Sequence, residues 1–139
     1  YNVSFTITTQ TKDMLSILFN GYTSPKGSKA LYNFMYTYNI DLKTGKNIRL
    51  SEYEDTSKLA KILYSGNGYT VNEEKAEEFK IYVSNFFEDV QELENMLKDY
   101  DYVNSITFPT GYSYFIDGNP VLCMEVNHSL GDYIEVRFD

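Results

Sequence analysis

The only histidine of the sequence, His128, offers the widest range of chemistry, because its ring can exchange a proton near neutral pH. It lies in the stretch Asn-His-Ser-Leu-Gly-Asp at residues 127–132, which places a hydroxyl and a carboxylate close to it in sequence. Such groups can form a nucleophilic triad. However, the sequence has no Gly-x-Ser-x-Gly nucleophile elbow. We therefore expect a loop before a final strand, and a hydrolase using His128 with nearby carboxylates is the alternative.

Carboxylate pairs are the second candidate for catalysis, since glycoside hydrolysis needs two of them across a cleft. Asp117 and Asp132 both lie in turn-like stretches, where Asp is favoured for structural reasons. Residues 99–101 (Asp-Tyr-Asp) and 117–119 (Asp-Gly-Asn) have oxygen ligands, but neither follows the twelve-residue calcium pattern with its closing Glu. A zinc site at His128 would need carboxylates as its other ligands. The sequence therefore predicts no catalytic residue, no metal site and no cofactor.

The single cysteine, Cys123, excludes an internal disulfide. It lies in the apolar run Val-Leu-Cys-Met at residues 121–124. A thiol among such neighbours is typical of a protein core, whereas a reactive thiolate needs a polar, accessible setting. We therefore expect Cys123 to be a buried structural residue.

The charge balance limits the partners of the chain. Twenty acidic residues against twelve basic ones give a net charge of -8, which disfavours nucleic acid and favours cationic partners. The same charge also serves solubility alone. The 139 residues suit one domain, and no membrane-spanning segment or signal peptide is visible in them. Because the sequence begins at Tyr1, we expect that residues before it have been removed.

Alternating apolar and polar residues predict strands in two blocks, one at each end of the chain. The first block has a half-buried strand with Val3, Phe5 and Ile7 on one face, and Gly45 suits the positive φ of a turn after its third strand. The expected strands are residues 3–8, 13–22, 31–40, 47–50, 103–108, 112–116, 120–126 and 132–138.

Between these blocks we expect two helices. Residues 55–64 form a short one, with a capping box at residues 51–54. A long one covers about residues 72–99, with Asn72 as its N-cap. The acidic residues of this helix form a solvated face or a docking surface for a basic protein. Its apolar stripe, at steps of three and four, consists of Phe79, Val83, Phe86, Val90, Leu93, Leu97 and Tyr100.

The order of these elements predicts the fold class. Strands, then helices, then strands favour an α+β fold over a doubly wound sheet. A stripe of about three heptads could also serve a coiled coil, but strands on both sides favour packing across a sheet. We expect a single α+β domain at residues 1–139, with a mainly antiparallel sheet packed against one long and one short helix.

Three stretches of the sequence resemble a known bacterial envelope domain. They are residues 15–22, residues 38–51 with Asp-Leu-Lys-Thr-Gly-Lys at 41–46, and the hairpin 114–126 leading to Leu-Gly-Asp-Tyr at 130–133. Over most of its length the chain is similar to the domain of unknown function in the extracytoplasmic part of the lysozyme-sensing anti-sigma-V factor. A similar domain precedes some peptidoglycan deacetylase catalytic domains.

The resemblance implies a non-catalytic extracytoplasmic binding or sensing domain of a bacterial envelope protein, either secreted or membrane-anchored. Its implied partners are a basic protein such as lysozyme or cell-wall glycan, and a structural accessory module beside a cell-wall enzyme is an alternative. The family begins with another strand-rich subdomain, so residues 1–139 would be the C-terminal part of a longer protein. The family's Gly-Gly-Ala-His-like loop is Lys-Gly-Ser-Lys-Ala at residues 26–30 here, so no role of that histidine is carried over.

Overall fold

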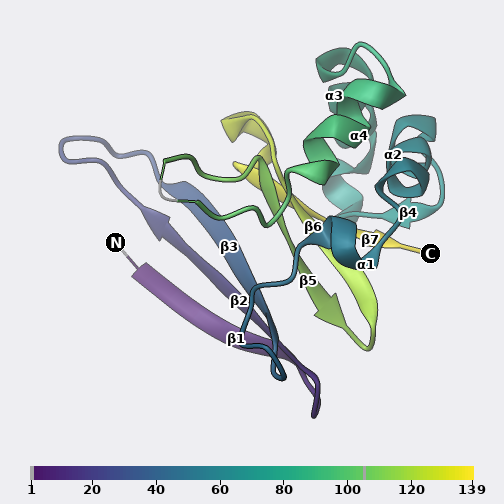
Figure 1. Cartoon of the computed structure of the whole chain (residues 1–139). Coiled ribbons are helices and arrows are strands. Elements are labelled where there is room, and N and C mark those ends of the chain that lie inside the picture. Colours follow the sequence, from purple (N-terminus) through teal and green to yellow (C-terminus); the bar gives the residue numbers. More distant parts are fainter. Residues whose placement is uncertain (1, 105) are drawn as a thin grey trace.

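The computed structural model describes residues 2–104 and 106–139 and has an α+β fold with two antiparallel sheets (Figure 1). The N-terminal sheet has the order β1-β2-β3, and the C-terminal sheet has the order β4-β7-β6-β5. The strands are β1 (Asn2–Gln10), β2 (Met14–Thr23), β3 (Tyr32–Asp41), β4 (Tyr69–Thr70), β5 (Gly111–Ile116), β6 (Asn119–Glu125) and β7 (Tyr133–Phe138). The helices are α1 (Leu50–Tyr53), α2 (Thr56–Ser65), α3 (Ala76–Phe86) and α4 (Val90–Lys98), with short 3₁₀ turns η1 (Glu73–Lys75) and η2 (His128–Leu130).

The main core lies between the helices and one face of the C-terminal sheet. Alternate residues of β6 and β7, such as Leu122 and Val136, point toward the helices and are fully buried. Phe79, Leu93 and Leu97 of the predicted stripe meet them and are also fully buried. Each large apolar side chain contributes about 2 kcal/mol when it leaves water. The helical period of the stripe therefore identified most of the helical core residues, with Phe86 as an exception.

The single long helix expected at residues 72–99 is wrong, because the chain breaks between α3 and α4. Asp89 accepts a hydrogen bond from the Glu92 amide at 2.9 Å, and the Glu92 carboxylate accepts one from the Glu88 amide at 2.7 Å. Asp89 is the N-cap of α4, and these two bonds start a new helix inside the stripe. As a result Phe87 is buried, whereas Phe86, which the stripe included, is 58% exposed. Asn72 is an N-cap as expected, but of η1, the 3₁₀ turn before α3: its side chain accepts a hydrogen bond from the Glu74 amide.

Three smaller expectations are also wrong. Residues 47–50 form no strand, since only Asn47 bridges to Ile40 before α1 begins at Leu50. The capping box expected at residues 51–54 does not cap the short helix: Asp55 caps α2 by accepting hydrogen bonds from the Ser57 and Lys58 amides. Residues 103–104 and 106–108 are not in a strand, and residue 105 lies outside the described part of the chain.

The two sheets meet where the free edge of β5 crosses the inner face of the N-terminal sheet. Side chains of that face bind the backbone groups of this edge. Thr37 and Asn39 donate to the Ser113 carbonyl at 2.5 and 2.8 Å, and Ser16 accepts from the Phe115 amide at 3.1 Å. An unpaired strand edge needs such partners when it is buried. We call this buried cluster the polar seam; it consists of Ser16, Thr37, Asn39, Asp101 and Ser113.

The opposite, outer face of the N-terminal sheet is apolar and faces solvent. The expected half-buried strand at residues 3–8 exists within β1, but its apolar side chains are not buried. Val3 is 39%, Phe5 66% and Ile7 48% exposed. The alternation was therefore a correct sign of a strand and a wrong sign of burial.

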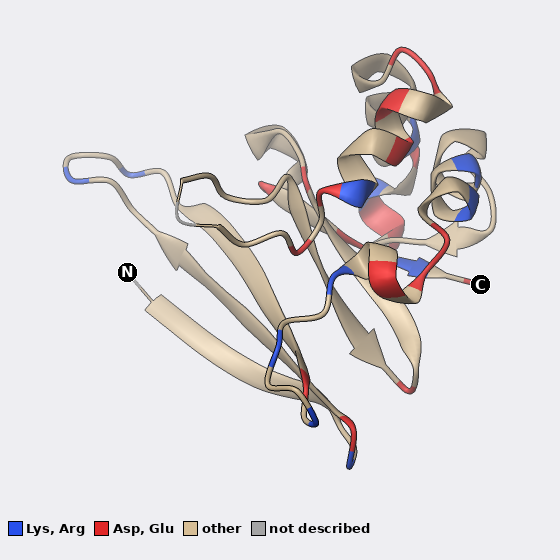
Figure 2. Cartoon of the chain, in the orientation of Figure 1, with Lys and Arg blue, Asp and Glu red and all other residues tan. Residues whose placement is uncertain are grey.

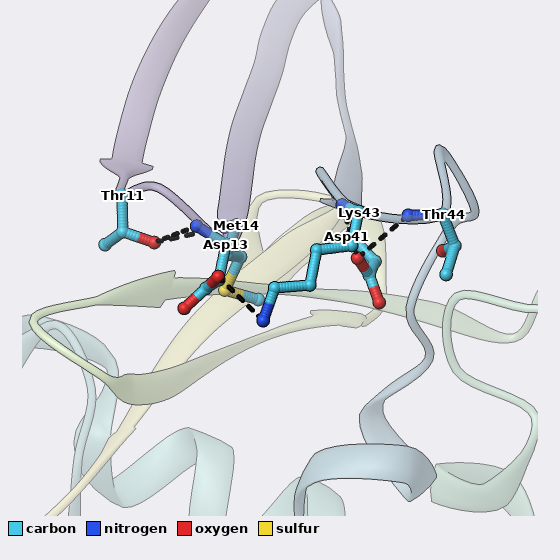
Figure 3. A network of polar contacts seen from close by, with 6 residues as sticks. All are labelled: Thr11, Asp13, Met14, Asp41, Lys43 and Thr44. Carbon is cyan, nitrogen blue, oxygen red and sulfur yellow. Dashed lines mark hydrogen bonds and ion pairs between the residues drawn. The ribbon is translucent and has the colours of Figure 1, made fainter.

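The turn stretch at residues 41–46 is attached to the β1–β2 turn (Figure 3). Asp41 accepts hydrogen bonds from the amides of Lys43 and Thr44, and these bonds lower the pKa of its carboxyl. The Lys43 ammonium lies 3.0 Å from the Asp13 carboxylate. Gly45 has a φ of 70°, as a turn residue without a Cβ can. The stretch at residues 41–46 is thus a turn that is tied to the β1–β2 turn at the same end of the N-terminal sheet.

A candidate binding pocket between the sheets

His128 has an acidic partner in the structure. Its Nδ1 lies 2.7 Å from Oδ1 of Asp132, and its ring packs against that of Tyr32 with centroids 4.6 Å apart. The Asp132 side chain is 14% exposed, whereas the His128 side chain is 54% exposed. A carboxylate on one ring nitrogen orients the imidazole and leaves Nε2 open, as in a catalytic dyad.

The third member of a triad is not beside this pair in the described residues. Ser129 follows His128 in η2, but no described hydroxyl makes a hydrogen bond to the open ring nitrogen. Asp117, the other sequence candidate, lies in the β5–β6 turn, at the opposite end of β6 from Asp132. Seven residues of strand separate these ends by about 20 Å, which is too far for a carboxylate pair.

Asp101, from the stretch 99–101, is part of the polar seam and is 1% exposed. Its carboxylate accepts hydrogen bonds from the Ser113 hydroxyl at 2.5 Å, the Ser113 amide at 2.7 Å and the Leu50 amide at 3.0 Å. Burial nevertheless raises its pKa to about 6. No cluster of three metal-ligating side chains occurs within residues 2–104 and 106–139. Asp101 thus joins α1 to both sheets.

Cys123 is buried as expected, with 3% of its surface exposed. Burial is the main cause that raises the pKa of its thiol well above the ordinary value, so the nucleophilic thiolate is disfavoured. Cys123 belongs to a small cluster in which Leu18 of β2 meets Tyr114 and Val121 of the C-terminal sheet. This thiol is a packing group.

A pocket of about 340 Å³ opens beside this cluster, between the start of β3 and the ends of β5 and β6. This size suits a small ligand or one side chain of a partner. We call it the tyrosine pocket. Its ring and acid lining consists of Tyr32, Phe34, Tyr112, Tyr133, Glu125 and Asp132.

The tyrosine pocket is held by a hydrogen bond between its walls, and its lining combines neutral tyrosines with carboxylates. The Asn33 amide donates to Oδ2 of Asp132 at 2.7 Å, which joins β3 to the loop before β7. Burial raises the pKa of the Tyr112 and Tyr133 hydroxyls, so both stay neutral donors at physiological pH. The lining contains no Lys or Arg among the described residues. The pocket therefore offers aromatic faces and negative charge to a ligand.

A second cleft, of about 500 Å³, lies on the other side of Met35 and Tyr133. It is lined by Lys75 and Arg137 as well as Glu135, so its charges are mixed. The Lys75 ammonium already donates to the Leu130 carbonyl. This second cleft has weaker charge selectivity than the tyrosine pocket.

Acidic residues gather on the helices and loops of the half of the molecule that follows β3 (Figure 2). Residues 1–48 carry five Lys and two Asp, a net charge of +3. Since the whole chain has a net charge of -8, residues 49–139 have a net charge of -11. Such a field accelerates the approach of cations toward this half, which includes Glu125 and Asp132.

Sequence reasoning found two of the residues around this pocket, His128 and Asp132, but it missed the tyrosines. Tyr32 lies in the strand expected at residues 31–40, where nothing in the alternation distinguishes it from the other tyrosines. Tyr112 and Tyr133 begin or nearly begin their strands, where a ring can extend past the sheet. No local signal separates such positions from ordinary strand tyrosines, because the pocket forms only when strands distant in sequence meet.

Neither the protein-family models nor the curated proteins compared with this chain give a match. None of the helices within the described residues combines the length and the apolar character needed to cross a membrane. What the chain does is therefore argued from the pocket and its charges.

Proposed function

We propose that the chain is a non-catalytic binding or sensing domain of the bacterial cell envelope, extracytoplasmic in location, that recognises a basic protein. One lysine or arginine side chain of the partner enters the tyrosine pocket. The observation that carries this proposal is the pairing of aromatic rings with Glu125 and Asp132 in one pocket. A cation gains from the negative faces of aromatic rings and from carboxylates together.

The charge distribution supports the same partner class. The acidic half of the molecule favours a basic protein during its approach, and the pocket then adds a specific contact. The resemblance to the lysozyme-sensing domain motivates lysozyme as the first probe and the envelope as the location. Cell-wall glycan is the other partner that the resemblance implies, and it forms a separate arm of the test.

Isothermal titration calorimetry of the chain against lysozyme, and separately against soluble muropeptides, tests the proposal. We expect lysozyme to bind, with an affinity that falls as salt is added. Glu125→Gln should weaken binding by about five- to tenfold, because it removes one carboxylate from the pocket without changing its size. Tyr112→Leu should weaken binding similarly by removing one ring.

Glu74→Gln is the matched control, since Glu74 is exposed on the acidic half but does not line the tyrosine pocket. It removes the same charge and should change the affinity by less than about twofold. Equal weakening by both variants would mean that net charge alone attracts the partner. Binding to muropeptides without binding to lysozyme would replace the basic protein by a glycan.

A hydrolase is the second candidate, and the 2.7 Å contact between His128 and Asp132 favours it. In that case the open Nε2 of His128 would activate water or a substrate hydroxyl as a general base. Turnover of generic ester or glycoside substrates that disappears in His128→Ala, with unchanged folding by circular dichroism, would support this candidate. Turnover that survives in His128→Ala would exclude His128 as the base.

A further inference from the structure

The outer face of the N-terminal sheet is one continuous apolar surface made by three strands. The register aligns Phe5 with Phe19 and Phe19 with Tyr36, and it aligns Ile7 with Ile17 and Ile17 with Tyr38 in the same way. Every residue of this face is exposed or half-buried. The outer face consists of Val3, Phe5, Ile7, Leu15, Ile17, Phe19, Phe34, Tyr36, Tyr38 and Ile40.

The rings of this face lie against one another in a row. The Phe19 and Tyr36 rings stack with centroids 5.0 Å apart, and Phe34 and Tyr36 stack at 6.1 Å. Phe34 also lies across Gly21, where a Cβ would stand 2.9 Å from its ring. The absence of a side chain at Gly21 thus lets the row lie low on the sheet, which favours contact with another flat surface.

The outer face is as large as the largest apolar patches that monomers leave in water, which often mark interaction sites. Phe5 is 66%, Ile7 48% and Tyr38 40% exposed, and the ten side chains together expose roughly 500 Å². Phe108, which is 91% exposed, shares a pocket with Tyr38 and extends the apolar surface beyond β3. Two such faces in contact would bury roughly 1,000 Å², which is the size at which specific interfaces begin.

Charge argues for a second copy of this chain as the occupant. No charged residue lies on the outer face, and Asp41 is the only one within β1, β2 and β3. A charged partner therefore gains nothing there. A glycan would lose hydration of its hydroxyls against a face whose only polar side-chain atoms are two tyrosine oxygens. The acidic helices lie away from the N-terminal sheet (Figure 2). In a pair of copies joined at this face they would therefore be far apart, and their mutual repulsion would be small.

We propose that two copies of this chain associate face to face through the outer face of the N-terminal sheet. The contact is a sheet-on-sheet packing of identical surfaces, related by a twofold axis. Because the buried area lies at the lower limit for a specific interface, the dimer should dissociate in the micromolar range. The tyrosine pocket shares Phe34 with the outer face, but its carboxylates, Glu125 and Asp132, lie outside that face.

Sedimentation velocity of the chain, from about 1 μM to about 500 μM, measures this association. We expect a monomer that converts to a dimer as concentration rises. Phe5→Lys should raise the dissociation constant at least about tenfold, because it places a charge in the apolar contact. Thr6→Lys, one residue along on the opposite side of β1, should change it by less than about twofold.

Three results would overturn the proposal. They are a monomer over the whole concentration range, equal weakening by the two lysine variants, and a dimer that dissociates when salt is added. Equal weakening would indicate pairing through the free edge of β1, and sensitivity to salt would indicate charged contacts. Circular dichroism of each variant at low concentration confirms folding, and the salt series needs only the unaltered chain.

Discussion

The two faces of the N-terminal sheet differ in a way that reverses the usual rule for a half-buried sheet. Where β5 crosses it, its inner face is polar and buried, with Ser16, Thr37 and Asn39 each at 2% exposure or less; Leu18 beside them packs on the C-terminal sheet. Its outer face is apolar and open to solvent. The reason is that this part of the inner face meets the edge of β5, whose backbone groups need hydrogen bonds. Polarity therefore follows what a surface contacts.

The helical core provides the opposite case within the same chain. There, apolar residues of α3 and α4 meet the apolar face of the C-terminal sheet, and burial follows hydrophobicity as expected. Stability should therefore depend on volume in the helical core, on hydrogen bonds in the polar seam, and on very little at the outer face of the monomer.

Truncation in the helical core should have the largest effect. Phe79→Ala removes a fully buried ring and should lower the free energy of unfolding by about 4 kcal/mol, because a cavity remains where the ring was. Urea denaturation followed by circular dichroism measures this change. A loss below about 1 kcal/mol would mean that the helices do not supply the main core.

The pH dependence of the polar seam should give the next largest effect. Burial raises the pKa of Asp101 from 3.8 to about 6, so the folded chain holds this proton more tightly than the unfolded chain. The resulting stabilisation is present below about pH 4 and is lost as the pH rises through about 6, with a total of about 3 kcal/mol.

Asp101→Asn isolates this contribution, because it removes the titration while other groups, such as Asp41, titrate in both chains. The difference in free energy of unfolding, unaltered chain minus variant, should decrease by about 2.5 kcal/mol from about pH 4 to about pH 8. Urea denaturation at both pH values gives the difference. If this free-energy difference stays constant or increases with pH, the hydrogen bonds that Asp101 accepts offset the cost of burying its carboxylate.

A single hydrogen-bonding group of the seam should have a smaller effect. Asn39→Ala removes the acceptor of the Ser16 hydroxyl and one donor to the Ser113 carbonyl, at a cost of about 2 kcal/mol. Tyr38→Thr is the control, since Tyr38 is the neighbouring residue on the outer face. The comparison of the two faces fails if chemical denaturation finds Tyr38→Thr the more damaging substitution.

The smallest effect should come from the outer face itself. Phe5→Thr, studied at about 1 μM where the chain is monomeric, should change the free energy of unfolding by about 0.5 kcal/mol or less. Thermal unfolding at that concentration measures it. A large destabilisation there would mean that Phe5 is packed within the monomer, contrary to its 66% exposure.

Local sequence patterns determined the α+β class, most strand positions and the buried side of the helices. They did so because hydrophobic period and turn residues act within a few neighbours. Six of the eight expected strands coincide with real strands, whereas residues 47–50 and the described residues of 103–108 do not form strands. The break at Asp89 could also have been found, since Asp-x-x-Glu at residues 89–92 is a capping pattern.

Tertiary structure alone decided which face of the N-terminal sheet is buried, and it created the polar seam and the tyrosine pocket. Asp101 meets Ser113 and Leu50, and Tyr32 meets His128, only after segments far apart in sequence have come together. The alternation of apolar and polar residues predicts only that a strand has two different faces. Which one is buried depends on the surface that the fold brings against it, and here that surface is a strand edge that needs hydrogen bonds.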